Sequence, residues 1–266
     1  MFLVTFGDVL LDVIVRTGEP LVPGADTRAS TNTGAGGQAA NVAAWAAALG
    51  ANARCVGKRG DDAAGRLVAT ELEEHGVELA GPVGGRTGVV VSLVAPDGER
   101  TMASDRGVAP ELAPEDLDPE WFACDCLHIS GYALLAAPID RAALRAGELA
   151  RASGARISVD LSAWTQISTH ERFRESLEQL APDVLFGNEE EWKAIGSFAG
   201  VHVVKRGARG FDVIRGGAVE RCQARDTAVV DATGAGDALA AGFHIGGVRL
   251  AAEAAARCVA KLGAMP

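Results

Sequence analysis

Aromatic and basic side chains are both scarce in this chain of 266 residues. Aromatic residues make up 5% of it and include a single tyrosine, which leaves little material for stacking on nucleobases. The 25 lysines and arginines are outnumbered by 35 aspartates and glutamates, giving a formal net charge of -10. Nucleic acids and anionic membranes would repel such a surface, so we expect neither as a partner.

Paired cysteines and long hydrophobic runs are missing as well. The five cysteines are odd in number and scattered, and neither they nor the histidines show metal-ligand spacing, which argues against a disulfide framework or a zinc site. The first apolar run has no basic start, and Asp8 and Asp12 interrupt it long before it could span a membrane. We therefore expect a cytoplasmic protein.

Short apolar runs alternate with helical stretches along most of the chain. Hydrophobic residues make up 48% of the chain and charged residues 23%, as in ordinary globular proteins. This alternation predicts an α/β fold with a mostly parallel sheet covered on both faces, in one main domain over 1–266. The predicted strands are 3–6, 53–56, 126–129, 157–161, 184–186 and 201–204, and the predicted helices are 42–50, 63–75, 140–152, 170–180 and 189–195.

Two segments do not look like core. Residues 18–34 are rich in Gly, Pro, Ser, Thr and Asn, whereas 87–94 form a β-branched run followed by a turn at 96–98 and a return strand over 99–104. Together with the extended piece 9–15, they predict a small antiparallel flap built from about 11–34 and 86–106.

The segment 231–237, Asp-Ala-Thr-Gly-Ala-Gly-Asp, is the strongest chemical signal. Its small residues precede a helical run, so the N–H groups of Gly234, Ala235 and Gly236 can converge on an anion at the positive end of the helix dipole. Asp237 in the first turn can accept a proton from an attacking hydroxyl. This pairing predicts phosphoryl transfer to an alcohol, with a plain glycine turn as the alternative.

A second glycine-rich segment, 34–41, leads into an alanine-rich helix, and Asn41 would project from the helix entry toward a ligand. Its spacing is a poor dinucleotide fingerprint, because no buried strand precedes it and no acidic residue follows at the expected place.

The two segments resemble the two signatures of the ribokinase-like sugar kinases, the phosphofructokinase-B type. The resemblance spans nearly the whole chain, since Asn188 to Glu191 is similar to the family's N-x-x-E element, 205–210 to its nucleotide loop, and 97–101 to a common flap turn. It implies a ribokinase-like three-layer α/β/α fold with a small β-sheet lid.

The resemblance also implies a role for each matching residue. Asp237 corresponds to the catalytic base, and Gly234, Ala235 and Gly236 to the anion hole. The remaining positions fall into three groups: Asp12, Gly36, Gly37 and Asn41 on the sugar; Asn188, Lys205, Gly207 and Gly210 on the nucleotide; and Glu191 on Mg²⁺ through water, with Asp231 and Thr233 beside a monovalent cation such as K⁺. Arg106, after the second flap strand, is a candidate for an anionic group of the substrate.

The departures from the family concern the substrate. Gln38 stands where ribokinase tends to have lysine, so ribose is not indicated. The segment 160–164 lacks the D-x-N-x-R pattern of fructokinase-like members, and Ala251 stands where some relatives place an asparagine near the nucleotide.

The resemblance thus predicts an ATP- and Mg²⁺-dependent kinase acting on a primary hydroxyl of a small sugar or sugar-like molecule. Two alternatives stay open: a nucleoside kinase of the same family, and a non-catalytic sugar-binding or regulatory protein on the same fold. Exposed apolar strands in the flap further predict either a homodimer through the lid or closure of the lid over sugar.

Overall fold

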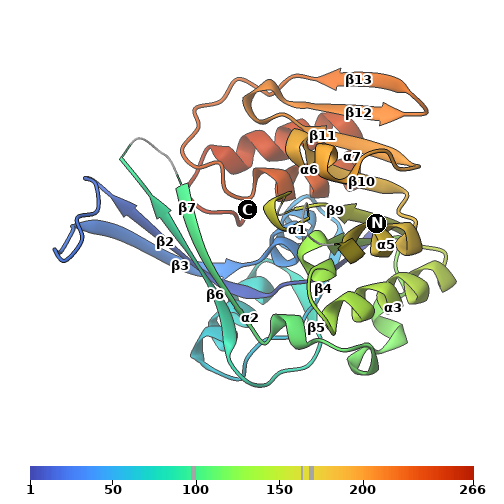
Figure 1. Ribbon diagram of the computed structural model, residues 1–266, viewed down its shortest axis with the longest axis horizontal. Helices are drawn as coiled ribbons and strands as arrows, with labels where there is room; N and C mark the ends of the chain where they lie inside the picture. The colour runs from blue at the N-terminus through green and yellow to red at the C-terminus, as the bar shows by residue number, and fades with distance from the viewer. Residues whose placement is uncertain (97–99, 163, 168–170) are drawn as a thin grey trace.

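A large mixed sheet forms the centre of the protein (Figure 1). The computed structural model describes residues 1–96, 100–162, 164–167 and 171–266. Within them, the large sheet has nine strands in the order β13 (Ala218–Cys222), β12 (Phe211–Arg215), β11 (Val201–Lys205), β10 (Val184–Asn188), β9 (Arg156–Asp160), β8 (Cys126–Ser130), β1 (Phe2–Phe6), β4 (Asn52–Val56) and β5 (Val77–Ala80).

The strands from β11 to β5 run parallel, which confirms the predicted mostly parallel sheet. Every residue of β8 is buried, as expected for a strand covered on both faces. The antiparallel pair β12 and β13 was not predicted. Gly216 and Gly217 join the two strands with φ of 55° and 86°, the positive values that a tight hairpin turn requires.

Helices cover both faces of the large sheet and give the predicted three layers (Figure 1). One face packs against α1 (Gln38–Ala48), α2 (Ala63–Glu74) and α7 (Ala235–Val259). The other packs against α3 (Ile139–Ala152), α4 (Trp164–Ile167), α5 (Glu171–Leu180) and α6 (Glu189–Ile195). Short 3₁₀ turns are η1 (Ala109–Glu111), η2 (Pro114–Asp116), η3 (Pro119–Phe122), η4 (Gly131–Leu134) and η5 (Gly207–Arg209).

The alanine-rich α1 is almost wholly buried and packs closely against α7. Small side chains allow this close approach. Toward the C-terminal end of α1, Trp45 donates its indole N–H to the carbonyl of Ala264 at 2.7 Å. The C-terminal residues are thereby held next to the segment that precedes α7. None of the described helices is long and apolar enough to cross a membrane.

A separate four-stranded sheet, here called the projecting sheet, extends from the main body (Figure 1). Its order is β3 (Ala29–Gly36), β2 (Leu10–Thr17), β6 (Thr87–Val94) and β7 (Arg100–Gly107). The prediction of an antiparallel flap is wrong at the central pair, because β2 and β6 are parallel. Both strands leave the main body in the same direction, and each returns through its own antiparallel neighbour. The predicted turn at 96–98 and the flap pattern at 97–101 lie partly outside the described residues.

Candidate active site

The segment 231–237 forms a tight turn that opens directly into α7. Gly234 adopts φ of 75°, a left-handed conformation, and a Cβ on it would lie 2.5 Å from that of Ala264. Only glycine fits there. The carbonyl of Gly234 accepts the N–H of Ala238 at 2.9 Å, and α7 begins at Ala235. The small residues therefore let α7 begin directly after the turn, and the role of its first N–H groups in binding an anion stays a prediction.

Hydrogen bonds between Asp231 and Thr233 fix the conformation of this turn. One carboxylate oxygen of Asp231 accepts the backbone N–H of Thr233 at 2.9 Å and its hydroxyl at 2.6 Å. The other oxygen accepts the N–H of Gly263 at 3.0 Å. The carboxylate thus ties the turn to the C-terminal segment, which is a structural contribution that the sequence pattern did not reveal.

Asp237 is buried in the first turn of α7 and contacts the start of α1. The side-chain amide of Asn41 donates to its Oδ2 at 2.7 Å. Burial raises the pKa of Asp237 to about 7, helped by Asp160 and opposed by the hydrogen bond from Asn41 and by Lys205. A carboxylate whose pKa lies near neutral pH is well suited to take a proton from an alcohol.

The predicted sugar-binding residues converge beside Asp237. A Cβ on Gly36 would lie 2.1 Å from the carboxyl carbon of Asp12, and one on Gly37 would lie 2.4 Å from the carbonyl oxygen of Asp8. The two glycines therefore let β3 pass close to the end of β1 and the start of β2. The carbonyl oxygen of the Asn41 side chain is buried, with no hydrogen-bond partner among the described residues. It is available to accept a bond from a ligand hydroxyl.

Arg106 comes from β7 of the projecting sheet and reaches the main body. Its guanidinium pairs with the buried carboxylate of Asp8 and lies 3.8 Å from the ring centroid of Tyr132, the only tyrosine of the chain. Burial raises the pKa of Tyr132 and lowers that of Arg106. Sequence reasoning identified Arg106 but not its contacts with Asp8 and Tyr132, although Asp8 lies two residues after the first strand.

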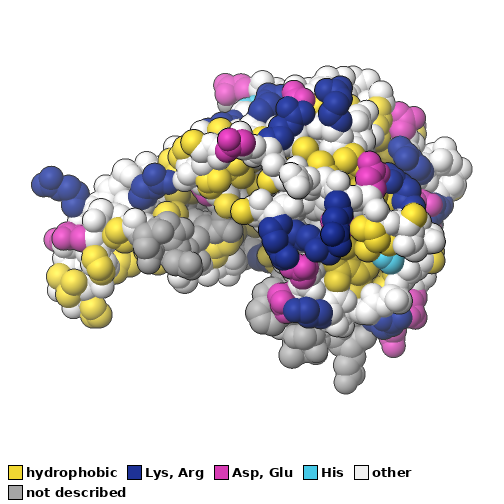
Figure 2. All heavy atoms as spheres, turned by 90° about the horizontal axis from the view of Figure 1, so that it is seen from above, with side chains coloured by type: hydrophobic (Ala, Val, Ile, Leu, Met, Phe, Trp, Pro, Cys, Tyr) yellow, Lys and Arg dark blue, Asp and Glu magenta, His cyan; other side chains and the backbone are white. Residues whose placement is uncertain are grey.

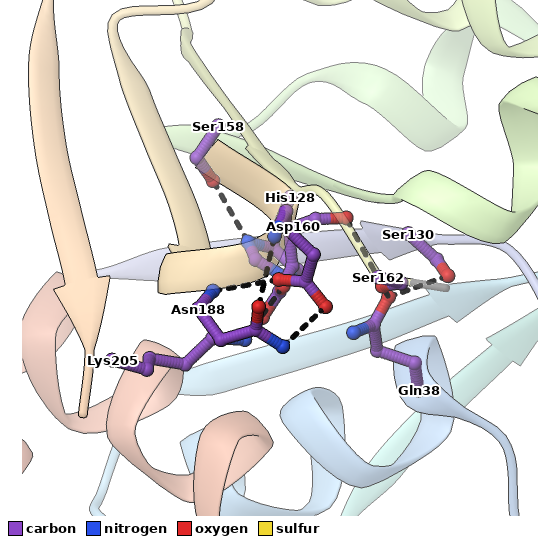
Figure 3. Close-up of polar contacts among 9 residues, drawn as sticks. Gln38, His128, Ser130, Ser158, Asp160, Ser162, Asn188 and Lys205 are labelled. Atoms are coloured by element: carbon purple, nitrogen blue, oxygen red, sulfur yellow. Dashed lines mark hydrogen bonds and ion pairs between the residues drawn. The ribbon is translucent and has the colours of Figure 1, made fainter. Parts of the chain in front are cut away.

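Gln38, Ser130 and Ser162 form a hydrogen-bonded group at the carboxyl end of the sheet (Figure 3). The amide oxygen of Gln38 accepts both serine hydroxyls, at 2.6 and 2.8 Å, so its NH₂ group is turned away from them. Gln38 stands at the position where ribokinase tends to have lysine, and it is neutral and oriented by its neighbours. The two serines were not predicted; the signal available was that Ser130 ends the buried strand β8 and that Ser162 lies two residues after the end of β9.

Asn188 and Glu191 cap the N-terminus of α6 through reciprocal hydrogen bonds. The carboxylate of Glu191 accepts the backbone N–H and the side-chain amide of Asn188 at 2.7 and 2.9 Å, and Asn188 accepts the N–H of Glu191 at 2.9 Å. Burial raises the pKa of Glu191, with Lys205 opposing. Within the described residues no cluster of three or more His, Cys, Asp or Glu side chains could ligate a metal directly. The pair therefore fits Mg²⁺ only through water and phosphate oxygens.

Lys205 ends β11 and forms an ion pair with Asp160 at the end of β9. Its Nζ lies 2.7 and 2.8 Å from the two carboxylate oxygens, and the Asp160 side chain is fully buried (Figure 3). Sequence reasoning placed Lys205 at the nucleotide and gave Asp160 no role. Both residues end strands at one edge of a parallel sheet, which is the signal that could have paired them.

A pocket of about 660 Å³ lies next to this edge, between α7, the turn after β11 and the segment after β13. Its walls include Lys205, Gly207 and Gly210, three of the predicted nucleotide-binding residues, and Ala235 and Gly236 of the turn at 231–237. The fourth, Asn188, does not line it. Apolar side chains such as Phe211, Leu239 and Val259 form much of the remaining wall, as in a pocket for a flat organic ring.

Together, the fold and the comparisons define a phosphotransferase of the sugar-kinase class. The chain belongs to the pfkB family of carbohydrate kinases, which it matches over residues 1–265. It is 33% identical over 255 residues to the ATP-dependent ribose-1-phosphate kinase of Halopiger xanaduensis, covering 89% of this chain and 81% of the relative. It is 34% identical to fructokinase-1 of Zea mays over 59% of this chain, but spans only 50% of that enzyme.

Solved structures share the fold. The adenosine kinase of Sinorhizobium meliloti superposes with a TM-score of 0.89 at 26% identity, over 99% of this chain and 95% of that one. An uncharacterised sugar kinase of Pyrococcus horikoshii, solved in complex with ATP, superposes with a TM-score of 0.85 at 21% identity, over 99% of this chain and 95% of that one. These likenesses confirm the ribokinase-like three-layer architecture.

Proposed function

We propose that this chain transfers the γ-phosphoryl group of ATP to a primary hydroxyl of a small sugar or sugar-like molecule. One observation carries the proposal: Asp237, with a pKa raised to about 7, lies between Asn41 on the sugar side and the anion-binding turn. A base, an anion cradle and a nucleotide-sized pocket thus meet at one point. The name of the Halopiger relative and the ATP complex of the Pyrococcus neighbour agree with ATP as the donor.

In this mechanism Asp237 takes the proton of the attacking hydroxyl. The amide of Asn41 holds the carboxylate in place, and the N–H groups at 234–236 stabilise negative charge on the transferring group. Mg²⁺, when bound, neutralises the phosphate oxygens, and Glu191 would hold it through water. Gly207 and Gly210 allow the nucleotide to approach the backbone at the mouth of the pocket.

The sugar would lie between β3 and the start of α1. Asp12, Gly36, Gly37 and Asn41 surround this position, and carboxylates and amides suit vicinal hydroxyls. Arg106 would reach it from the projecting sheet and could release Asp8 to bind an anionic substituent. A sugar phosphate is therefore a substrate to test beside neutral sugars, as the name of the Halopiger relative also suggests.

A nucleoside is the second candidate. The likeness to an adenosine kinase at 26% identity favours it. Against it, the single tyrosine of the chain is already stacked on Arg106, so it is not free to stack on a base.

We further propose that K⁺ binds near Asp231 and Thr233 and supports the geometry of the turn. These residues already set the conformation of the backbone that would face the phosphate. Rates measured in potassium should exceed those measured in a bulky organic cation at the same ionic strength. Equal rates would contradict the potassium proposal without affecting the kinase proposal.

A coupled assay for ADP release tests the main proposal over hexoses, pentoses, sugar acids, sugar phosphates and nucleosides. At least one acceptor should give turnover, and Asp237→Asn should lower it by about 10² to 10⁴, the usual contribution of a general base. A variant that kept more than about a tenth of wild-type activity would contradict the role of Asp237. Ligand binding with no turnover on any acceptor would favour a non-catalytic protein instead.

A further inference from the structure

The Lys205 ammonium lies beside the anion-binding turn, whereas the sequence resemblance assigns Lys205 only to the nucleotide loop. A Cβ built on Gly236 would lie 3.3 Å from Nζ, so the ammonium lies against Gly236, the last residue of the turn at 234–236. Its side chain is only 19% exposed, and the partner carboxylate of Asp160 is fully buried. Two strands separated by β10 thus bring one cation to the place where transferred charge would collect (Figure 3).

The surroundings keep this lysine charged. Burial opposes the ammonium, but the carboxylates of Asp160 and Glu191 outweigh it and raise the pKa of Lys205. An ammonium has three N–H donors, and Asp160 accepts from it through both oxygens. The third N–H of Lys205 can therefore donate to an acceptor on the side of the turn.

We propose that Lys205 is a catalytic residue that contacts the transferring phosphoryl group, and that Asp160 is the positioning residue that aims it. The inference rests on the proposed kinase function. In the transfer, the acceptor oxygen bonds to phosphorus, the bond to the bridging oxygen breaks with its electrons leaving on ADP, and Asp237 takes the acceptor's proton. Lys205 donates to a non-bridging oxygen throughout, opposite the N–H of Gly236.

The geometry distinguishes this role from that of a simple nucleotide contact. If Lys205 only bound the nucleotide, its removal would weaken binding in the ground state and the transition state alike. KM would then rise while kcat stayed unchanged. A donor aimed at the transferring group acts mainly on kcat, and removing one such donor typically costs about 10² to 10³ in rate. Lys205 also lowers the pKa of Asp237, so its loss should move the pH profile.

The experiment compares Lys205→Met, Lys205→Gln and Asp160→Asn with wild type on the best acceptor of the panel. Lys58→Met is the matched control, because Lys58 has a 20% exposed side chain and its own carboxylate partner, Glu111, and neither residue is among the proposed site residues. Both Lys205 variants should lose about 10² in kcat with the KM for ATP within about threefold. The midpoints of their pH–rate profiles should lie at higher pH than that of wild type, because Lys205 lowers the pKa of Asp237. Asp160→Asn should lose less, and the control should match wild type.

Binding of ADP with and without aluminium fluoride, which imitates the transferring phosphoryl group, supplies a readout that needs no turnover. Wild type should bind ADP more tightly when aluminium fluoride is present, and the Lys205 variants should lose this gain while keeping their affinity for ADP. The inference is overturned if both Lys205 variants keep more than a third of wild-type kcat. It is also overturned if aluminium fluoride still tightens the binding of ADP to these variants. Failure of wild type on every acceptor overturns the kinase proposal itself, and the fluoride measurement then decides the role of Lys205 separately.

Discussion

At Asp237, burial and a neighbouring amide act on the same carboxylate in opposite directions. Burial raises its pKa to about 7, whereas Asn41 favours the charged form. The base works only when deprotonated, so kcat/KM should rise with pH through about 7 and level off above it. A pH–rate profile of the wild-type enzyme measures this, and a profile that is flat from pH 5 to 8 would contradict it.

The raised pKa of Asp237 also predicts how the stability of the folded protein depends on pH. Since the folded pKa lies above the ordinary value of 3.8, the folded protein holds a proton that the unfolded chain has lost between about pH 4 and pH 7. Stability should therefore fall as pH rises through this window and stay constant above it. Asp237→Asn lacks this loss, so its free energy of unfolding relative to that of wild type should increase by about 3 kcal/mol between pH 5 and pH 8, at ~1.4 kcal/mol for each pH unit between pH 5 and the folded pKa. Urea unfolding of both proteins at pH 5 and pH 8 measures it; an equal difference at both values would contradict it.

Single residues could be predicted from sequence where their partners are close in the chain or share a recognised pattern. Gly234, Ala235, Gly236 and Asp237 are contiguous, and the structure places them in one turn as expected. The pair of Asp160 and Lys205 is 45 residues apart and depends on the order of strands, which no local pattern specifies. The same holds for the contact of Arg106 with Asp8.

At the scale of elements, the first turn of α7 depends on small residues. A Cβ on Gly236 would meet only the end of the flexible Lys205 side chain, so Gly236→Ala should keep most activity. Gly236→Val should lower kcat and raise the KM for ATP, because a branched side chain displaces the ammonium and crowds the cradle. Steady-state kinetics of the two variants check this graded effect. Equal activity of the two would show that nothing binds at the turn.

The start of α2 is joined to the projecting sheet through Asp62. Its carboxylate caps the helix at Gly65 at 2.8 Å and accepts the hydroxyl and N–H of Thr87 at 2.6 and 2.9 Å. These bonds, that of the Thr87 hydroxyl most of all, lower the pKa of Asp62 to about 2. Its stabilisation is therefore present above about pH 4 and lost as pH falls through 2.

Asp62→Ala should accordingly cost about 1 to 2 kcal/mol at pH 7, the upper range for a helix cap. Thermal unfolding measures the loss. Asp118→Ala is the control, because Asp118 caps a short 3₁₀ turn, and among the described residues its carboxylate accepts only the N–H of Glu120. If the two variants lost the same stability, the bonds to Thr87 would contribute nothing.

Periodicity predicted most helices and parallel strands within a few residues, since burial on both faces leaves a continuous apolar run. It missed three strands: β5, which has only four residues, β12, and β13, whose residues are mostly exposed. It also missed the parallel pairing of β2 with β6. The projecting sheet has a weaker pattern because most of β3 is exposed and polar. Its topology follows from where the strands leave the main body, which is a property of the whole fold.

For the molecule as a whole, the projecting sheet leaves apolar surface uncovered. Hydrophobic side chains gather at its tip (Figure 2). Leu21 and Val22, in the loop between β2 and β3, are 56% and 59% exposed, and Met102 of β7 is 48% exposed. Its outer strands, β3 and β7, end the sheet on both sides. Edges and apolar faces of this kind are seldom left bare in solution.

We predict that the projecting sheet is covered either by that of a second copy or by closing over bound sugar. In the first case light scattering should give a dimer, and Val22→Asp should shift it to a monomer. The control Val219→Asp should leave the dimer intact, because Val219 is 52% exposed on β13, at the far end of the other sheet. In the second case the monomer's projecting sheet should resist protease better with sugar than without, because closure removes its strands from solvent. A monomer with the same protease sensitivity in both conditions would exclude both forms of cover.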